Sequence, residues 1–68
     1  MTIDELNLVA KLSEIQPKDV DDDEIAEIMQ DALGITDNDS YEAITFITEN
    51  SDIPYDTIQR VYKTFLNS

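Results

Sequence analysis

The chain has 68 residues and carries sixteen Asp and Glu against four Lys and Arg, which gives a formal net charge of 4 − 16 = −12. It contains neither Cys nor His, which excludes disulfides, thiolate metal sites and catalysis by a thiol or an imidazole. Its length allows a single domain, residues 1–68. We therefore predict no enzyme, with no catalytic, cofactor or metal site.

The negative charge also restricts the partners. It repels nucleic-acid phosphates and anionic membrane surfaces, and it favours a protein partner with a basic surface. No apolar run approaches the roughly 18 residues of a membrane span, and the first residues are acidic where a signal peptide would be basic. We expect a cytoplasmic protein. The simplest alternative is that the charge only keeps a small domain soluble.

The charge is spread unevenly. Residues 1–39 hold twelve acids and two lysines, a net of −10, whereas residues 57–68 contain no acid. We predict that the acid-rich stretch binds the partner through Asp19, Asp21, Asp22, Asp23, Glu24 and Glu27. Tyr55, which follows Pro54 at the start of the acid-poor segment, is predicted as an interface anchor because exposed tyrosines often anchor interfaces.

The first predicted helix covers about residues 3–15. Thr2 and Glu5 have the spacing of a capping box, in which each side chain satisfies a free backbone N–H at the helix start. Pro17 ends the helix, because proline disfavours a helical residue before it. The apolar positions spread over more than one face, which leaves open a homodimer or partner packing through this helix.

The second predicted helix covers about residues 22–33 and begins with a second capping box, which runs from Asp21 to Glu24. The carboxylates favour the positive end of the helix dipole. Gly34, the only glycine, is the expected left-handed stop at its C-terminal end. A one-sided apolar stripe at helical spacing follows the cap: Ile25, Ile28, Met29 and Ala32.

Two further helices are predicted. Asp39 and Glu42 form a capping pair that starts a helix of about residues 40–50, and Pro54 favours the start of another at about 54–66. The Thr-rich stretch 44–48 has strand propensity, but no second strand is available to pair with it. The fold class is therefore all-α, a compact domain of four helices.

Residues 44–62 resemble a helix-turn-helix motif. In that motif a short first helix, a tight turn and a second helix cross steeply. Ile47 would anchor the first helix, Ile53 would fill the turn, and Ile58 and Val61 would seat the second helix. The motif usually has a left-handed glycine where this chain has Asp52. Together with the helix at 22–33, the segment resembles the three-helix core of small bacterial or phage regulators (about residues 22–66), to which the first helix is an addition.

The resemblance implies DNA contacts from the second helix of the motif. Thr57, Gln59, Arg60 and Lys63 would face the groove and could donate to base edges or phosphates. The net charge opposes this, because one Arg and one Lys release few counterions. We therefore expect a non-enzymatic regulatory or accessory protein that docks on a basic or nucleic-acid-binding partner. The alternative is sequence-specific DNA binding through residues 44–66.

Overall fold

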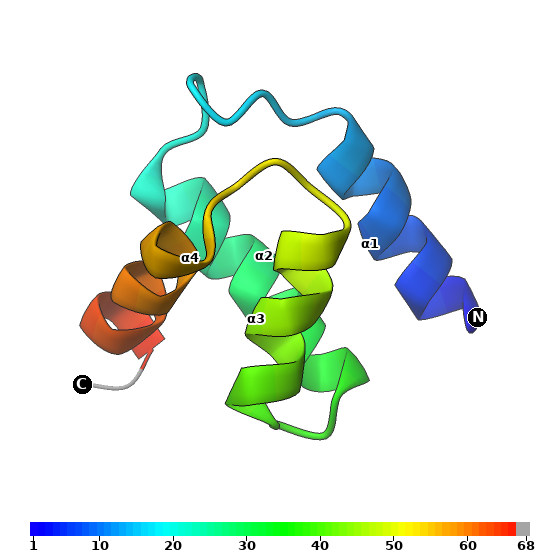
Figure 1. Cartoon of the computed structure of the whole chain (residues 1–68). Coiled ribbons are helices and arrows are strands. Elements are labelled where there is room, and N and C mark those ends of the chain that lie inside the picture. Colours follow the sequence, from blue (N-terminus) through cyan, green and yellow to red (C-terminus); the bar gives the residue numbers. More distant parts are fainter. Residues whose placement is uncertain (67–68) are drawn as a thin grey trace.

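The computed structural model describes residues 1–66, which form four α-helices joined by short loops (Figure 1). The helices are α1 (Ile3–Ser13), α2 (Asp22–Ile35), α3 (Ser40–Glu49) and α4 (Tyr55–Val61), and α4 continues into a π-helical turn, η1 (Tyr62–Leu66). Residues 1–66 contain no strand. The predicted all-α fold with four helices is confirmed.

The first three helices begin at the predicted caps. The Thr2 hydroxyl accepts the N–H of Glu5 at 3.2 Å, and the Glu5 carboxylate accepts the N–H of Thr2 at 3.1 Å, which completes the capping box. Asp21 and Asp39 cap α2 and α3, each accepting the N–H three residues further on, at 2.8 and 3.0 Å. These bonds satisfy amide groups that have no partner within the helix.

Several helix ends differ from the prediction. α3 ends at Glu49, one residue early, and the helix predicted for 54–66 is α-helical to Val61 and π-helical from Tyr62 to Leu66. α1 ends at Ser13, two residues early. The N–H groups of the next two residues bond three residues back, to Lys11 and Leu12, and the Ser13 hydroxyl donates to the Ala10 carbonyl at 2.7 Å. The last turn is thus tightened before Pro17 is reached. α4 begins one residue late, because Pro54 is its N-cap rather than its first residue.

The expectation that Gly34 stops α2 is wrong. The helix continues through Gly34 to Ile35, and Gly34 has no positive φ. The left-handed residues of the described chain are instead Asp37 (φ 56°) and Asn38 (φ 67°). The N–H of Asn38 reaches back to the Leu33 carbonyl at 2.8 Å, the bond typical of a left-handed helix end. Asp and Asn tolerate this conformation, so α2 gains another half-turn in which Ile35 packs against the core.

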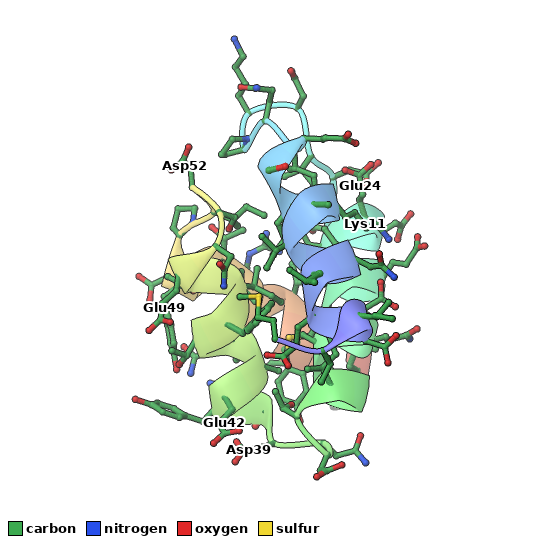
Figure 2. All side chains as sticks on the ribbon, turned by 90° about the vertical axis from the view of Figure 1, so that its right-hand side faces the viewer. Lys11, Glu24, Asp39, Glu42, Glu49 and Asp52 are labelled. Atoms are coloured by element: carbon green, nitrogen blue, oxygen red, sulfur yellow. The ribbon has the colours of Figure 1, made fainter. Side chains whose placement is uncertain are left out.

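α2 is the central helix, and α1, α3, α4 and η1 all pack against it. α1 and α3 lie beside one another with their N-terminal ends at the same end of the molecule (Figures 1 and 2). In residues 1–66 every fully buried side chain is apolar. The core consists of Leu8, Leu12, Ile25, Ile28, Met29, Ala32, Ala43, Ile44, Ile47, Ile53, Ile58 and Val61.

The segment from α3 to α4 has a buried interior but an unusual turn. The four residues that the helix-turn-helix resemblance places inside are buried: Ile47, Ile53, Ile58 and Val61. Asp52 is not left-handed. Instead, the Ser51 hydroxyl donates to the Ile47 carbonyl at 2.6 Å and accepts the Ile53 N–H at 3.2 Å. Any pair of packed helices buries such residues, so the helix-turn-helix geometry stays a prediction.

Candidate functional site

The acids predicted to bind a partner lie on two different sides of α2. Asp23, Glu24, Glu27 and Asp31 are exposed. At 100° per residue they fall within one third of the helix circumference, opposite the buried stripe. We call these four residues the acidic α2 face. Asp22 lies on the side of α2 that meets α4 and is half-buried.

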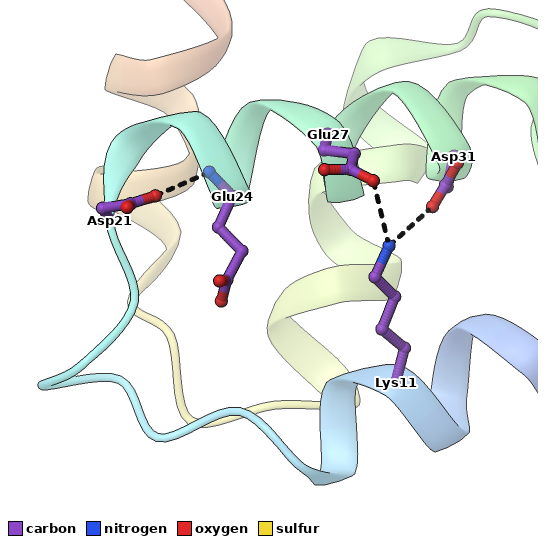
Figure 3. Close-up of polar contacts among 5 residues, drawn as sticks. All are labelled: Lys11, Asp21, Glu24, Glu27 and Asp31. Carbon is purple, nitrogen blue, oxygen red and sulfur yellow. Dashed lines mark hydrogen bonds and ion pairs between the residues drawn. The ribbon is translucent and has the colours of Figure 1, made fainter.

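One lysine from α1 lies against the acidic α2 face (Figure 3). The Lys11 Nζ is 3.6 Å from Oε1 of Glu27 and 3.4 Å from Oδ2 of Asp31. Its position in the last turn of α1 is also favourable for the helix dipole. The side chains of Lys11, Glu27 and Asp31 are 42%, 69% and 51% exposed, so these carboxylates remain accessible to a partner.

Asp31 was not among the predicted residues, although the sequence holds the signal for it. Asp23, Glu27 and Asp31 follow one another at intervals of four, which places them in a line along one helix face. The prediction followed the density of acids along the chain instead of the helical period. The predicted set therefore came mainly from the loop before α2 and from the first turn of α2, and it left out Asp31.

The two acids of the loop have other surroundings. Asp19 is exposed in the turn after α1, and its N–H donates to the Gln16 carbonyl at 2.9 Å. The carboxylate of Asp21 holds the first turn of α2 through the N–H of Glu24 (Figure 3). Asp21 therefore has a structural role, whether or not it also meets a partner.

Asp22 forms a two-pronged ion pair with Arg60 of α4. The two guanidinium nitrogens donate to the two carboxylate oxygens, each at 3.1 Å. The hydrogen bonds from Arg60, and then its charge, hold the pKa of Asp22 below the ordinary value of 3.8, and the same contacts raise the pKa of Arg60. The structure thus joins a residue of the predicted protein-binding set to a residue of the predicted DNA-binding set.

The remaining predicted residues of α4 and η1 differ in their exposure to solvent. Thr57 and Gln59 are half-buried, whereas Lys63 is exposed. Tyr55, the predicted anchor, is half-buried because it packs against the core. Tyr41 at the start of α3 is the more accessible tyrosine, with 69% of its surface exposed.

A shallow groove of about 460 Å³ follows the seam between α1 and α2. Asp4 and Lys11 line it from α1, and Gln30 and Asp31 line it from α2. The acidic α2 face therefore borders a depression in which a side chain from another protein has room. Gly34 also lines this groove, and no atom lies within 4 Å of the position where a Cβ would be added to it.

Other kinds of site find little support among residues 1–66. No three acidic side chains in this part of the chain lie close enough together to hold a metal ion. No helix within it combines the length and the apolar character needed to cross a bilayer. We compared the chain with models of known protein families, with curated proteins and with solved structures, and none of them matches.

Proposed function

We propose that the protein is a non-enzymatic regulatory or accessory protein that binds a partner with a basic surface through the acidic α2 face. The observation that carries this proposal is the line of Asp23, Glu27 and Asp31 on the central helix, with one lysine beside it. Catalytic carboxylates usually owe their shifted pKa values to burial, and residues 1–66 hold no buried ionisable side chain. The cytoplasmic location stays a prediction from the sequence.

The acids of this line have a defined geometry. Residues four apart on a helix are about 6 Å apart along its axis, so Asp23, Glu27 and Asp31 span about 12 Å. The cap at Asp21 and the packing of three helices hold α2 in place. A partner that presents Lys or Arg at a similar spacing would meet carboxylates in fixed positions, and the net charge of −12 would speed the encounter.

The experiment compares two variants that remove the same charge. Asp23→Asn/Glu27→Gln/Asp31→Asn neutralises the line on α2, and Glu14→Gln/Asp52→Asn/Asp56→Asn neutralises three exposed acids elsewhere. Each tagged protein is used to capture proteins from the lysate of the native cells at 50 mM and at 500 mM NaCl. Mass spectrometry then identifies the captured proteins.

We expect the wild type and the control variant to capture the same basic proteins at low salt. The α2 variant should not capture them, and high salt should release them from the wild type and the control variant, because salt screens exposed charges. Equal capture by the two variants would show that the line on α2 is not the binding surface. Capture that resists high salt would show that the partner is not held by charge.

Sequence-specific DNA binding is the second candidate; it rests on the helix-turn-helix resemblance of residues 44–62, with which the burial of Ile47, Ile53, Ile58 and Val61 is compatible. The ion pair opposes it, because Asp22 occupies the guanidinium of Arg60. If α4 reads DNA, Asp22→Asn should tighten binding to a pool of random duplexes at 20 mM NaCl, measured by gel shift, and Arg60→Ala should abolish it. If neither the wild type nor Asp22→Asn shifts DNA at that salt concentration, this candidate fails.

A further inference from the structure

A second groove, of about 340 Å³, lies between α1 and α3. Ile35 and Phe46 give it apolar walls, and Tyr41 stands at the end where α3 begins. Figure 2 looks onto this side of the molecule, with Glu42 and Glu49 on one side of α1 and Glu24 on the other. The groove is therefore a different surface from the acidic α2 face.

Glu5 lines the groove from α1. By helical spacing Glu5 lies on the inner side of α1, one turn before the buried Leu8. An apolar residue there could close the gap to α3, but the Glu5 carboxylate is held by the N–H and the hydroxyl of Thr2 at 3.1 Å. These hydrogen bonds lower the pKa of Glu5, so the groove keeps a charge on its α1 side.

The rim of the groove is acidic on both sides. Glu5 lies on the α1 side, and Glu42 and Glu49 lie on the α3 side. No Lys or Arg lines the groove. Glu42 and Glu49 are seven residues apart, which places them on the same face of α3 and about 10 Å apart along its axis. Phe46 lies between them.

Of the exposed apolar side chains on α1 and α3, Tyr41 lines the groove, and 69% of its surface is exposed. Ile3 (76% exposed) and Leu6 (53% exposed) fall by helical spacing on the outer face of α1, away from the buried Leu8. Both helices begin at the same end of the molecule (Figures 1 and 2). A groove with apolar walls and an acidic rim is the complement of a helix that is apolar on one face and basic at its edges.

We propose that the groove between α1 and α3 binds a basic amphipathic helix of a partner protein. Apolar side chains of that helix would lie between Phe46 and Ile35, and Lys or Arg residues seven apart would meet Glu42 and Glu49. A second copy of this chain is a poorer occupant, because each copy carries a charge of −12 and presents acids at the groove. This proposal does not depend on the acidic α2 face.

The test uses a fluorescent 18-residue helical peptide with leucine on one face and lysine on the other, and fluorescence anisotropy as the readout. Glu42→Lys/Glu49→Lys reverses the rim on α3, and Glu14→Lys/Asp56→Lys makes the same change in net charge at two exposed acids outside both the groove and the acidic α2 face. We expect the rim variant to weaken binding by about tenfold and the control variant by less than threefold, because the peptide pairs directly only with the rim. Equal weakening by both variants would overturn the proposal.

Two further measurements keep the result decisive if the double variant folds poorly. Tyr41→Ala changes an exposed side chain and should weaken binding of the peptide without altering the helical circular dichroism. In ¹H–¹⁵N spectra of the wild type, the peptide should shift the amides of Thr45 and Phe46. Shifts confined to α2, or a dimer that forms through the groove without peptide in sedimentation experiments, would contradict the proposal.

Discussion

Replacing Gly34 by alanine should stabilise the protein. The residue lies inside α2, with Ile35 still helical after it and no positive φ. No atom lies within 4 Å of the position that the added Cβ would take. Alanine can therefore adopt the same backbone without a clash, and it loses less conformational freedom on folding than glycine does.

The size of the effect follows from the place of Gly34 in the helix. In a helix interior, glycine is about 1 kcal/mol less favourable than alanine. Gly34 lies in the last turn, two residues before the cap at Thr36, where helices fray, so we expect about half of that value, about 0.5 kcal/mol. In a domain of this size, this gain raises the Tm by about 2–4 °C.

The assay is thermal and urea unfolding followed by circular dichroism, and Asn38→Ala is the matched control. Asn38 has a φ of 67°, and alanine there would take on the left-handed strain, about 1 kcal/mol. The two alanine variants should therefore shift the Tm in opposite directions. A lower Tm for Gly34→Ala would refute the reasoning, because it would mean that Gly34 is the left-handed stop of α2 after all.

Three other outcomes can be measured on the same instruments. Ile47→Ala removes a fully buried side chain and should cost about 2–5 kcal/mol, much of the roughly 3–10 kcal/mol expected for a chain of this length, so its urea midpoint should fall sharply. Because the pKa of Asp22 is lowered on folding, its stabilising effect is present above about pH 4 and is lost as the pH falls through the folded value. The higher Tm of the wild type over Asp22→Asn at pH 7 should therefore shrink steadily as the pH is lowered below about 4. Raising NaCl from 20 to 500 mM should raise the Tm of the wild type, since salt screens the repulsion within a body of charge −12, and a falling Tm would contradict this.

The helices could be predicted from the sequence because local signals decide them. Thr2, Asp21 and Asp39 each place a side-chain acceptor three residues before an amide that needs one, and an apolar stripe follows each cap. The end of α2 was predicted wrongly because two signals competed. Gly34 suits a left-handed stop, but Asp37 and Asn38 can also take that conformation, and the packing of Ile35 against the core favours the later end.

The surfaces were harder to predict because they depend on which helices meet. The ion pair of Asp22 with Arg60 joins residues 38 positions apart, and Lys11 reaches Asp31 from another helix. Neither contact follows from spacing along the chain. The groove between α1 and α3 also depends on the angle between two helices. Of these surface features, only the line of acids on α2 could have been predicted from the sequence, because residues four apart lie on the same face of a helix.

The line of acids on α2 has opposing effects on its own helix: Asp23 lies in the first turn, where the helix dipole favours an acid, but like charges repel along the line. Like charges four residues apart on a helix destabilise it by about 0.2–0.5 kcal/mol per pair, and Asp23, Glu27 and Asp31 form two such pairs. α2 has no basic residue in its last turn, and Lys11 of α1 offsets part of the repulsion. Solubility alone requires only net charge, which could be spread over all four helices at a lower cost. Departures from what local stability favours tend to occur at functional sites, and the repulsion along this line is therefore in keeping with the proposed binding of a basic partner there.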